Sequence, residues 1–511
     1  MKRKFLFGML CTAAILAQAQ TKITIYPGKS VQTINKNIYG HFAEHLGTCI
    51  YGGLWVGENS PIPNTNGYRT DVLEALKKLQ IPVLRWPGGC FADEYHWQDG
   101  IGAPEKRPKM VNNNWGGTIE DNSFGTHEFL NFCELLGCEP YISGNVGSGT
   151  VEELAKWVEY MTSDGDSPMA NLRRQNGRDK AWNVKYLGVG NESWGCGGDM
   201  FPEYYADLYR RYAVYCRNYD GNRLFKIASG ASDYDYNWTE TLMRKIGQKM
   251  NGLSLHYYTV TGWDGSKGSA TQFTPEEYYW IIGKCLEIEE VIQKHIAIMD
   301  KYDREKRIAL LVDEWGTWFD EEPNTIRGHL FQQNTMRDAF VAALSLNIFN
   351  KYTDRVQMAN IAQIANVLQS MVLTKGNKML LTPTYHVFEM YKVHQDATYL
   401  PLDITTETRE IRGRNVQNVS VSASKKGDAI NITLANIDLE KAQEITIDLS
   451  DYKVKNVSGR ILTSKQITGH NTFENPDLVK PQGFTDVKTT KIQGQLKVKM
   501  PAKSIIVLEI N

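Results

Sequence analysis

The sequence predicts an α/β protein, a (β/α)8 TIM barrel with a jelly-roll-like C-terminal β-sandwich that the N-terminal strand completes. Two observations lead to this fold class. Between residues 38 and 395 short aliphatic runs alternate with amphipathic stretches, whereas from residue 396 apolar and polar residues alternate one by one. The chain has 511 residues, of which 42% are hydrophobic, so it can bury two sizeable cores.

Eight apolar runs are the candidate barrel strands, because each is short and stops at glycine or at polar residues. They are residues 38–45, 81–89, 139–147, 184–192, 225–232, 252–259, 308–315 and 356–363. Between most of them lie amphipathic stretches such as 71–80, 126–137 and 151–161, with apolar residues at three- and four-residue spacing. Eight strands with intervening helices is the count of a TIM barrel. An open doubly wound sheet is the alternative, but no G-x-G-x-x-G motif follows its first strand.

The last part of the chain has the period-two alternation of half-buried antiparallel strands. The alternating segments are residues 419–437, 443–450, 459–464, 495–500 and 504–510. Residues 21–28 show the same pattern ahead of the first barrel strand. We therefore expect residues 20–37 and 396–511 to form one β-sandwich, and residues 38–395 to form the barrel.

Residues 1–19 have the composition of a cleavable signal peptide. Basic residues 2–4 precede an apolar run at 5–16, and Ala-Gln-Ala at 17–19 resembles a cleavage site. The run is too short to span a bilayer, so the pattern predicts a secreted or periplasmic protein. A net charge of −1 gives no electrostatic reason to expect nucleic acid or a membrane as a partner.

The cysteines indicate neither a disulfide scaffold nor a metal site. Of the eight cysteines one lies in the predicted signal peptide, which leaves an odd number between Cys49 and Cys285 and no C-x-x-C motif. A bridge such as Cys133 with Cys138 is open, but free and buried thiols are the main expectation. We expect no metal and no cofactor.

Two glutamates stand where predicted strands stop. Glu192 follows the run that ends in Gly-Val-Gly-Asn, and Glu314 ends a run of aliphatic residues. Parallel strands place their carboxyl ends on one face, where α/β folds carry their chemistry. A strand-end glutamate alone is about as often an ion-pair partner. Two from different strands, beside Asn191 and Trp315, favour a general acid paired with a nucleophile or base.

Other strand ends carry polar groups too. They include His41, Glu44, Arg85, Asp93, His256, Tyr258, Asn360 and Gln363. For any single residue of this set a structural hydrogen bond is an equally good interpretation. Polar groups from so many strand ends are costly to bury without purpose, and together they favour a site for a polar substrate.

Six ordered motifs resemble the signature strings of glycoside hydrolase family 51, the α-L-arabinofuranosidases. They are GHFAEHLG (40–47), YGGLWVG (51–57), RWPGGCFADEYHW (85–97), GVGNESW (188–194), DEWGTW (313–318) and MANIAQ (358–363). The resemblance covers nearly the whole chain after residue 19. It implies a retaining enzyme on a (β/α)8 barrel with a β-sandwich made from both chain ends. Members are often oligomeric, so a homo-oligomer is one possible state.

The resemblance also implies roles for particular residues. Glu192 would be the general acid/base and Glu314 the nucleophile. The substrate-binding residues that we expect are Glu44, Cys90, Trp97, Asn191, His256, Tyr258, Trp318 and Gln363. Among these, Tyr258 would contact the nucleophile, and Trp97 and Trp318 would shape the cleft.

Cys90 departs from part of the family, in which asparagine follows the Gly-Gly of the second strand. A thiol is a poor substitute for an amide donor. Two interpretations are equally open: Cys90 is a small buried filler, or its thiol packs against the sugar.

The sequence therefore predicts a retaining, exo-acting α-L-arabinofuranosidase that acts on terminal non-reducing residues of arabinan, arabinoxylan and oligosaccharides. Another retaining glycosidase on the same barrel, an endoglucanase or β-xylosidase, is the alternative enzyme. A non-catalytic sugar-binding protein is the alternative from another class.

The stretch from His41 to His45 also fits H-x-x-E-H, a zinc-peptidase motif, but it follows a strand and leads into a loop rather than lying on a helix.

Overall fold

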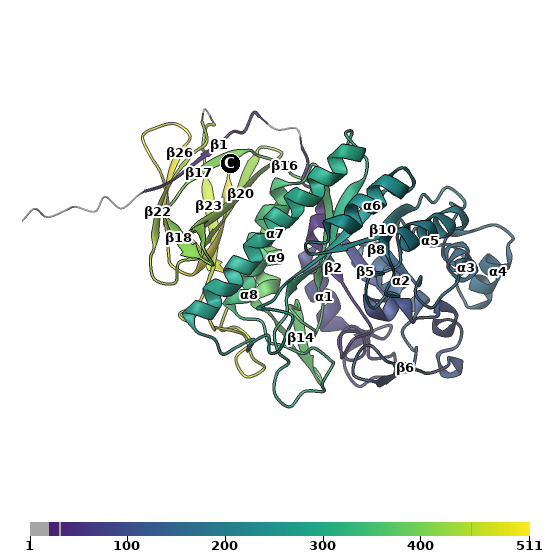
Figure 1. Ribbon diagram of the computed structural model, residues 1–511. Coiled ribbons are helices and arrows are strands. Elements are labelled where there is room, and N and C mark those ends of the chain that lie inside the picture. Colours follow the sequence, from purple (N-terminus) through teal and green to yellow (C-terminus); the bar gives the residue numbers. More distant parts are fainter. Residues whose placement is uncertain (1–19, 30–31, 451) are drawn as a thin grey trace, which may run out of the picture.

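The computed structural model describes residues 20–29, 32–450 and 452–511, which form a barrel and a β-sandwich lying side by side (Figure 1). Residues 1–19, which carry the signal-peptide prediction, lie outside the described part of the chain. Within the described part, no helix combines the length and the apolar character needed to cross a membrane.

Eight parallel strands close into a barrel, as the alternating pattern predicts. In chain order they are β2 (Gly40–Phe42), β5 (Val83–Trp86), β8 (Glu139–Gly144), β9 (Tyr186–Val189), β10 (Phe225–Ser232), β11 (Gly252–Thr259), β12 (Ala309–Thr317) and β13 (Val356–Ala362). The last strand pairs with the first, Asn360 opposite Gly40, and closes the sheet. The predicted barrel is confirmed, and the doubly wound alternative is wrong.

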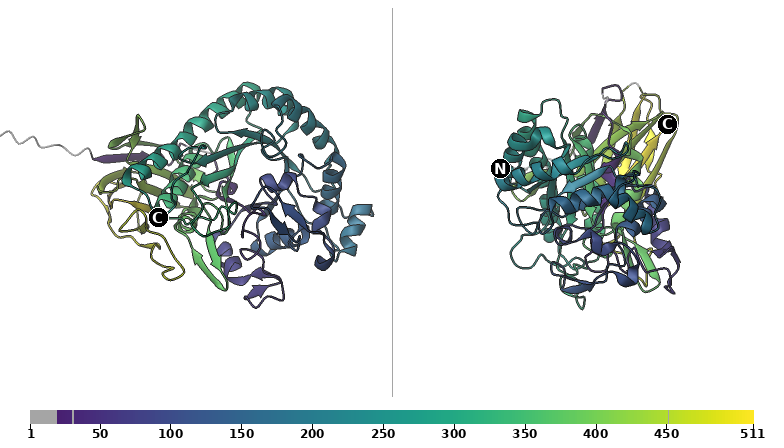
Figure 2. Two further views of the ribbon diagram at one scale, coloured as in Figure 1. Left: turned by 60° about the horizontal axis from the view of Figure 1, so that its bottom comes forward. Right: turned by 90° about the vertical axis from the view of Figure 1, so that its right-hand side faces the viewer.

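Helices pack outside the strands, and the left view of Figure 2 shows an arc of them around the barrel. They are α1 (Thr70–Leu79), α2 (Thr126–Leu136), α3 (Val151–Thr162), α4 (Pro168–Gln175), α5 (Pro202–Tyr215), α6 (Tyr236–Ile246), α7 (Pro275–Tyr302), α8 (Met336–Lys351) and α9 (Pro383–Tyr391). Helix α3 begins where the Thr150 side chain accepts from the Glu153 amide. Helix α8 is buried along almost its whole length because it packs against both parts, and Asn347 hydrogen-bonds to Ser420 of the sandwich.

The loops that leave the carboxyl ends of the strands carry short additional elements. They are β3 (Asn64–Thr65) and β4 (Tyr68–Arg69) after β2; η2 (Cys90–Asp93), η3 (Trp97–Gly100), η4 (Pro104–Lys106), β6 (Met110–Asn112) and β7 (Thr118–Glu120) after β5; and β14 (Val372–Lys375) and β15 (Lys378–Leu381) after β13. Three further 3-10 turns are η1 (Lys36–Tyr39), η5 (Gly247–Lys249) and η6 (Lys392–His394). The long loops therefore surround the face on which TIM barrels place their active sites.

The opposite end of the barrel is filled by apolar side chains from the first halves of the strands. They form a cluster of their own, made of Val83, Tyr141, Tyr186, Ile227, Ala309, Leu311 and Met358. A barrel filled in this way is a packed core rather than a pore, so polar groups are left to the carboxyl-end face.

Two sheets make the sandwich. The five-stranded sheet runs β17 (Leu402–Thr405), β1 (Thr21–Ile25), β22 (Gln443–Asp448), β26 (Gln495–Met500), β25 (Val487–Thr489). The six-stranded sheet runs β16 (Thr398–Tyr399), β20 (Val419–Lys426), β21 (Ala429–Asn436), β27 (Ser504–Ile510), β23 (Val457–Thr463), β24 (Gln482–Gly483), and β18 (Thr408–Ile411) with β19 (Arg414–Gln417) forms a hairpin.

Strand β1 lies inside the first sheet, antiparallel to β17 and parallel to β22. Its alternating residues Ile23 and Ile25 join a second core between the sheets, which also contains Ile432 and Leu508. The N-terminal strand thus completes the C-terminal sandwich, as the period-two pattern predicts.

Candidate active site

Glu192 and Glu314 both lie at the carboxyl ends of barrel strands. Glu314 is inside β12 and only 5% exposed. Glu192 follows β9 and has a φ of +39°, a left-handed backbone that a residue with a Cβ adopts only where its surroundings hold it. An oxygen of one carboxyl group lies within 4.8 Å of an oxygen of the other. This proximity suits a proton donor acting together with a nucleophile.

Hydrogen-bond donors hold Glu314 from two sides. Nη1 of Arg85 donates to its Oε1 at 2.8 Å, and the hydroxyl of Tyr258 donates to its Oε2 at 2.8 Å. The buried guanidinium also donates to the backbone oxygen of Asp313 at 3.0 Å and to Oδ1 of Asn191 at 2.5 Å. Because Arg85 is itself fixed by these acceptors, the carboxylate of Glu314 keeps one orientation.

Glu192 has different neighbours. Its Oε1 accepts from Nδ1 of His256 at 2.8 Å, and its Oε2 faces two sulfur atoms. Burial raises the pKa of Glu192 above its ordinary value; the hydrogen bond from His256 opposes this, and the negative charge of Glu314 adds to it. A carboxyl group with a raised pKa can stay protonated near neutral pH and act as a general acid.

His256 lies among three carboxylates. Besides Glu192, its Nδ1 is 3.5 Å from Oε2 of Glu314, and its Nε2 is 3.3 Å from Oδ1 of Asp313. Burial by itself lowers the pKa of His256, but the carboxylates outweigh burial and raise the pKa to about 10. The imidazolium and Arg85 therefore oppose the negative charges of the acidic groups around them.

A fourth acidic residue, Glu44, lies in the same mouth. It accepts hydrogen bonds from the Phe91 amide at 3.2 Å, from Nε1 of Trp115 at 2.9 Å and from Nε2 of Gln363 at 2.8 Å. Burial, with the nearby charge of Glu314, raises the pKa of Glu44 to about 7 against these hydrogen bonds. Glu44 and Gln363, two of the predicted substrate-binding residues, are therefore brought together.

The backbone segment that lies between the side chains of Glu44 and Glu314 consists of glycine residues. A Cβ on Gly89 would lie 3.0 Å from Oε1 of Glu44 and 3.2 Å from Oε1 of Glu314, tighter than ordinary contact. The Gly88-Gly89 pair thus allows a close backbone approach that residues with side chains would obstruct.

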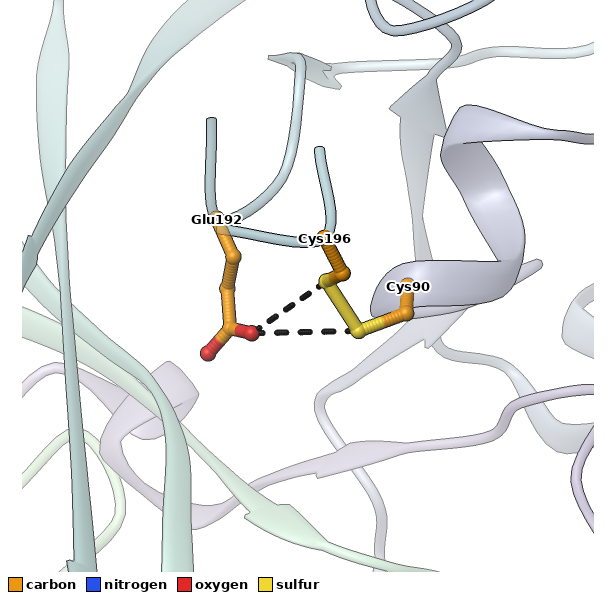
Figure 3. Close-up of side chains that lie close together, drawn as sticks. All are labelled: Cys90, Glu192 and Cys196. Carbon is orange, nitrogen blue, oxygen red and sulfur yellow. Dashed lines mark hydrogen bonds between the residues drawn. A yellow bond between two sulfur atoms is a disulfide. The ribbon is translucent and has the colours of Figure 1, made fainter. Parts of the chain in front are cut away.

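Cys90 is not a free thiol, which corrects both sequence-based interpretations of it. It forms a disulfide with Cys196, and the two sulfurs lie 3.8 and 3.4 Å from Oε2 of Glu192 (Figure 3). A disulfide sulfur carries no hydrogen, so these are contacts rather than bonds donated to the carboxyl group. The suggested bridge between Cys133 and Cys138 is wrong, since both are free. The pairing spans 106 residues of sequence and depends on how two loops meet.

Trp97 does not reach the site. It is 1% exposed, stacks on Trp157 and donates from Nε1 to the backbone oxygen of Glu153. Trp115, in contrast, donates to Glu44 of the acidic cluster. It was not predicted, because it lies after β6 in a long loop rather than at a strand end.

Aromatic side chains form one rim of the mouth. Trp318 lies edge-on to Tyr258, with ring centres 5.2 Å apart, and edge-on to Trp263, with ring centres 5.7 Å apart. Trp263 is 51% exposed and was not predicted. Trp318 therefore lies beside Tyr258, which bonds Glu314, and Trp263 extends the aromatic surface towards solvent.

The histidines of the H-x-x-E-H stretch have separate structural surroundings. His41 packs against Phe388, and burial lowers its pKa to about 3. His45 lies 3.2 Å from Glu120 through Nδ1, and its Nε2 accepts from Trp86. Because the two histidines face different partners, the geometry does not match the helical histidine pair of a zinc peptidase.

Two family models match the chain: the alpha-L-arabinofuranosidase 1 domain at residues 75–265 and the alpha-L-arabinofuranosidase C-terminal domain at residues 313–504. A Bacteroides ovatus protein named intracellular exo-alpha-L-arabinofuranosidase is 70% identical over 100% of both chains. Alpha-L-arabinofuranosidase C of Emericella nidulans is 32% identical over 95% of this chain and 96% of its own.

Solved structures agree with these matches. A GH51 arabinofuranosidase from Xanthomonas axonopodis pv. citri superposes with a TM-score of 0.94 and 49% identity, covering 96% of this chain and 100% of that one. An alpha-L-arabinofuranosidase from Thermotoga maritima, solved as an arabinose complex, superposes with a TM-score of 0.82 and 30% identity over 96% and 99%.

The prediction of a signal peptide and of a secreted or periplasmic protein is contradicted by the Bacteroides ovatus relative, whose name describes an intracellular enzyme. The prediction rested on the composition of residues 1–19 alone. Basic residues ahead of an apolar run are shared by many N-terminal segments, and composition does not decide whether a segment is recognised for export.

Proposed function

The chain belongs to glycoside hydrolase family 51, the α-L-arabinofuranosidases, and on that premise we propose that it hydrolyses with retention, using Glu192 as acid/base and Glu314 as nucleophile. It is an arabinofuranosidase that acts on arabinose-containing glycans. The observation that carries the proposal is that one carboxyl oxygen of Glu192 and one of Glu314 lie within 4.8 Å of each other. Retaining glycosidases hold their carboxyl groups about 5–5.5 Å apart, whereas inverting enzymes need about 6.5–9.5 Å.

In the first step, an oxygen of Glu314 attacks the anomeric carbon and the bond from that carbon to the leaving oxygen breaks. Glu192 gives its proton to the leaving oxygen. The orientation that Arg85 and Tyr258 impose on Glu314 supports this role, because attack requires an ionised oxygen aimed at one carbon atom.

In the second step, the loss of the charge on Glu314 allows Glu192 to act as a base. Esterified Glu314 carries no charge, so the repulsion that raises the pKa of Glu192 disappears. Glu192 then takes a proton from water, whose oxygen bonds to the anomeric carbon while the ester bond to Glu314 breaks. Arabinose leaves with its original anomeric configuration.

We assign sugar recognition to the polar groups beside the two carboxyl groups. Oδ1 of Asn191 already accepts from Arg85, and Nδ2 points one hydrogen at Sγ of Cys196, which leaves the second amide hydrogen for the 2-hydroxyl of the arabinosyl ring. Glu44 and Gln363 form a hydrogen-bonded pair that can hold further hydroxyls. Contacts to the 2-hydroxyl strengthen as positive charge develops on the ring, so they favour the transition state.

The substrates that we propose are terminal, non-reducing arabinofuranosides of arabinan, arabinoxylan and oligosaccharides. The exposed ring of Trp263 beside Trp318 supports an extended leaving group, because aromatic faces stack on sugar rings. A Bacteroides ovatus relative that is named an exo-enzyme supports action at chain ends. Association into a homo-oligomer is tested separately by light scattering of the purified chain.

Two measurements test this function. Proton NMR of arabinose released in the first seconds should show the α anomer, and first appearance of the β anomer would mean inversion. Aryl α-L-arabinofuranosides should be cleaved far faster than aryl β-D-xylopyranosides or β-D-glucosides. Comparable rates on the last two would instead support the alternative of another glycosidase on this barrel.

A further inference from the structure

The disulfide beside Glu192 places three potential metal ligands together. Sγ of Cys90, Sγ of Cys196 and a carboxyl oxygen of Glu192 all lie within 4.8 Å of one another (Figure 3). Cys196 is exposed, and Cys90 and Glu192 are partly buried, so small solutes can reach the group. In the bridged form the sulfurs are poor ligands, because a metal ion binds the thiolate.

We propose that reduction of the Cys90–Cys196 bridge creates a binding site for a thiophilic divalent cation of the Zn²⁺ type, formed by both thiolates and Glu192. A dithiol reductant supplies two electrons and two protons, the sulfur–sulfur bond breaks, and the reductant becomes a disulfide. The incoming cation then displaces the two thiol protons.

The distances suit such an ion. For zinc–sulfur and zinc–oxygen bonds of about 2.3 and 2.0 Å, tetrahedral geometry puts sulfur and oxygen about 3.5 Å apart. The observed separations of Oε2 of Glu192 from the two sulfurs are 3.4 and 3.8 Å. After reduction the sulfurs must move to about 3.8 Å from each other. Cys196 can make this movement by rotation of its exposed side chain.

The chemistry favours this group over the other compact cluster in the described part of the chain. That cluster consists of Glu192, His256 and Glu314. Both ring nitrogens of His256 already face carboxylates, Nδ1 towards Glu192 and Nε2 towards Asp313, so neither is free to bind a metal ion. Two thiolates select soft ions such as Zn²⁺ and Cd²⁺, whereas Mg²⁺ and Ca²⁺ prefer oxygen ligands.

A cation at this site should inhibit hydrolysis, a consequence that rests on the proposed acid/base role of Glu192. A carboxylate oxygen bound to a metal ion cannot hold the proton that the leaving group needs. With two thiolates, one carboxylate and an open fourth position, the site would resemble a three-ligand zinc centre. The pair of cysteines would then make activity depend on both thiol oxidation and metal concentration.

Cadmium titration of the full-length, metal-free enzyme tests the site without relying on activity. The reduced enzyme should bind one more Cd²⁺ per chain than the oxidised enzyme, with the ultraviolet absorption of cadmium–thiolate bonds. Cys196→Ser should lose this additional ion. Cys138→Ser, which alters the other pair of neighbouring cysteines, should retain it. Circular dichroism of the reduced wild type should show an intact fold.

Equal Cd²⁺ binding by reduced and oxidised enzyme, or unchanged binding by Cys196→Ser, would overturn the proposed site, as would loss of the fold on reduction. In the same samples, Cd²⁺ should slow hydrolysis of an arabino-oligosaccharide at least tenfold, and a chelator should restore the rate. Binding without inhibition would overturn the regulatory part alone. A failure of the acid/base assignment would show in the kinetics of the Glu192 variants measured without metal. The proposed metal site and the proposed catalytic role can therefore be tested separately.

Discussion

Glu192 and Glu314 are the same residue type, and a carboxyl oxygen of one lies within 4.8 Å of a carboxyl oxygen of the other, yet their surroundings differ. Glu314 lies within a strand and accepts from Arg85 and Tyr258. Glu192 lies in a loop on left-handed backbone, bonded to His256 and touching a disulfide. The comparison teaches how environment would divide the two proposed roles, with the carboxyl group of Glu314 held in one orientation and that of Glu192 placed to exchange its proton.

Removing the fixed carboxylate should have the largest effect. Glu314→Gln should lower kcat on the order of 10⁴–10⁶-fold for aryl and oligosaccharide substrates alike, because neither can form the glycosyl-enzyme without the nucleophile. Steady-state kinetics check this. Glu305→Gln changes an exposed glutamate far from the mouth and should leave kcat unaltered. A Glu314 variant with substantial activity on either substrate would refute its role as nucleophile.

Removing the proton-exchanging carboxyl group should have an effect that depends on the leaving group. Glu192→Ala should lower kcat/KM for oligosaccharides about 10²–10⁴-fold, because their leaving oxygen needs a proton. Dinitrophenyl arabinofuranoside needs little protonation, so its kcat/KM should fall much less. An equal fall in kcat/KM for both substrates would contradict the assignment of Glu192 as the general acid.

A smaller change should follow from removing the cation beside Glu192. The hydrogen bond and charge of His256 lower the pKa of Glu192, so His256→Asn should raise that pKa. Because the acid must be protonated, the alkaline limb of the kcat/KM profile should move to higher pH, by about 1 unit. His96→Asn removes an exposed histidine that pairs with Glu153 and should leave the profile in place. A shift to lower pH would contradict this electrostatic account.

The smallest expected effect separates two tryptophans. Trp115→Phe removes a donor to Glu44 and should lower kcat/KM about tenfold, the loss of roughly 1.5 kcal/mol for a hydrogen bond to a charged group. Trp97→Phe alters a buried stack and should lower Tm with little change in kcat/KM. If Trp97→Phe lowered kcat/KM and Trp115→Phe did not, Trp97 rather than Trp115 would act in the site.

The strand ends were predictable because their signals are local. Each barrel strand is a short apolar run, and the residue that ends the run must lie at the mouth of the barrel. This reasoning placed Glu44, Tyr258 and Gln363 where the structure has them. The same local alternation assigned residues 21–28 to the sandwich, although their partner strands lie near the other end of the chain.

The loop-borne parts of the site were not predictable, because their positions depend on long-range packing. Trp115 reaches Glu44 only through the loop that follows β5, and the family resemblance had implied Trp97 instead. Cys196 lies four positions after Glu192, yet nothing local indicates that it meets Cys90. Export was likewise inferred from composition, and the intracellular relative contradicts it.

The configuration of arabinosyl azide formed by the two alanine variants tests the division of roles most directly. In Glu192→Ala, azide should attack the glycosyl-enzyme from the face that the leaving group vacated and give the α azide. In Glu314→Ala, azide should take the place of the missing carboxylate, attack the substrate from the opposite face and give the β azide. Exchange of these two products between the variants, or no azide product from either, would contradict the assignment of Glu192 as acid/base and Glu314 as nucleophile.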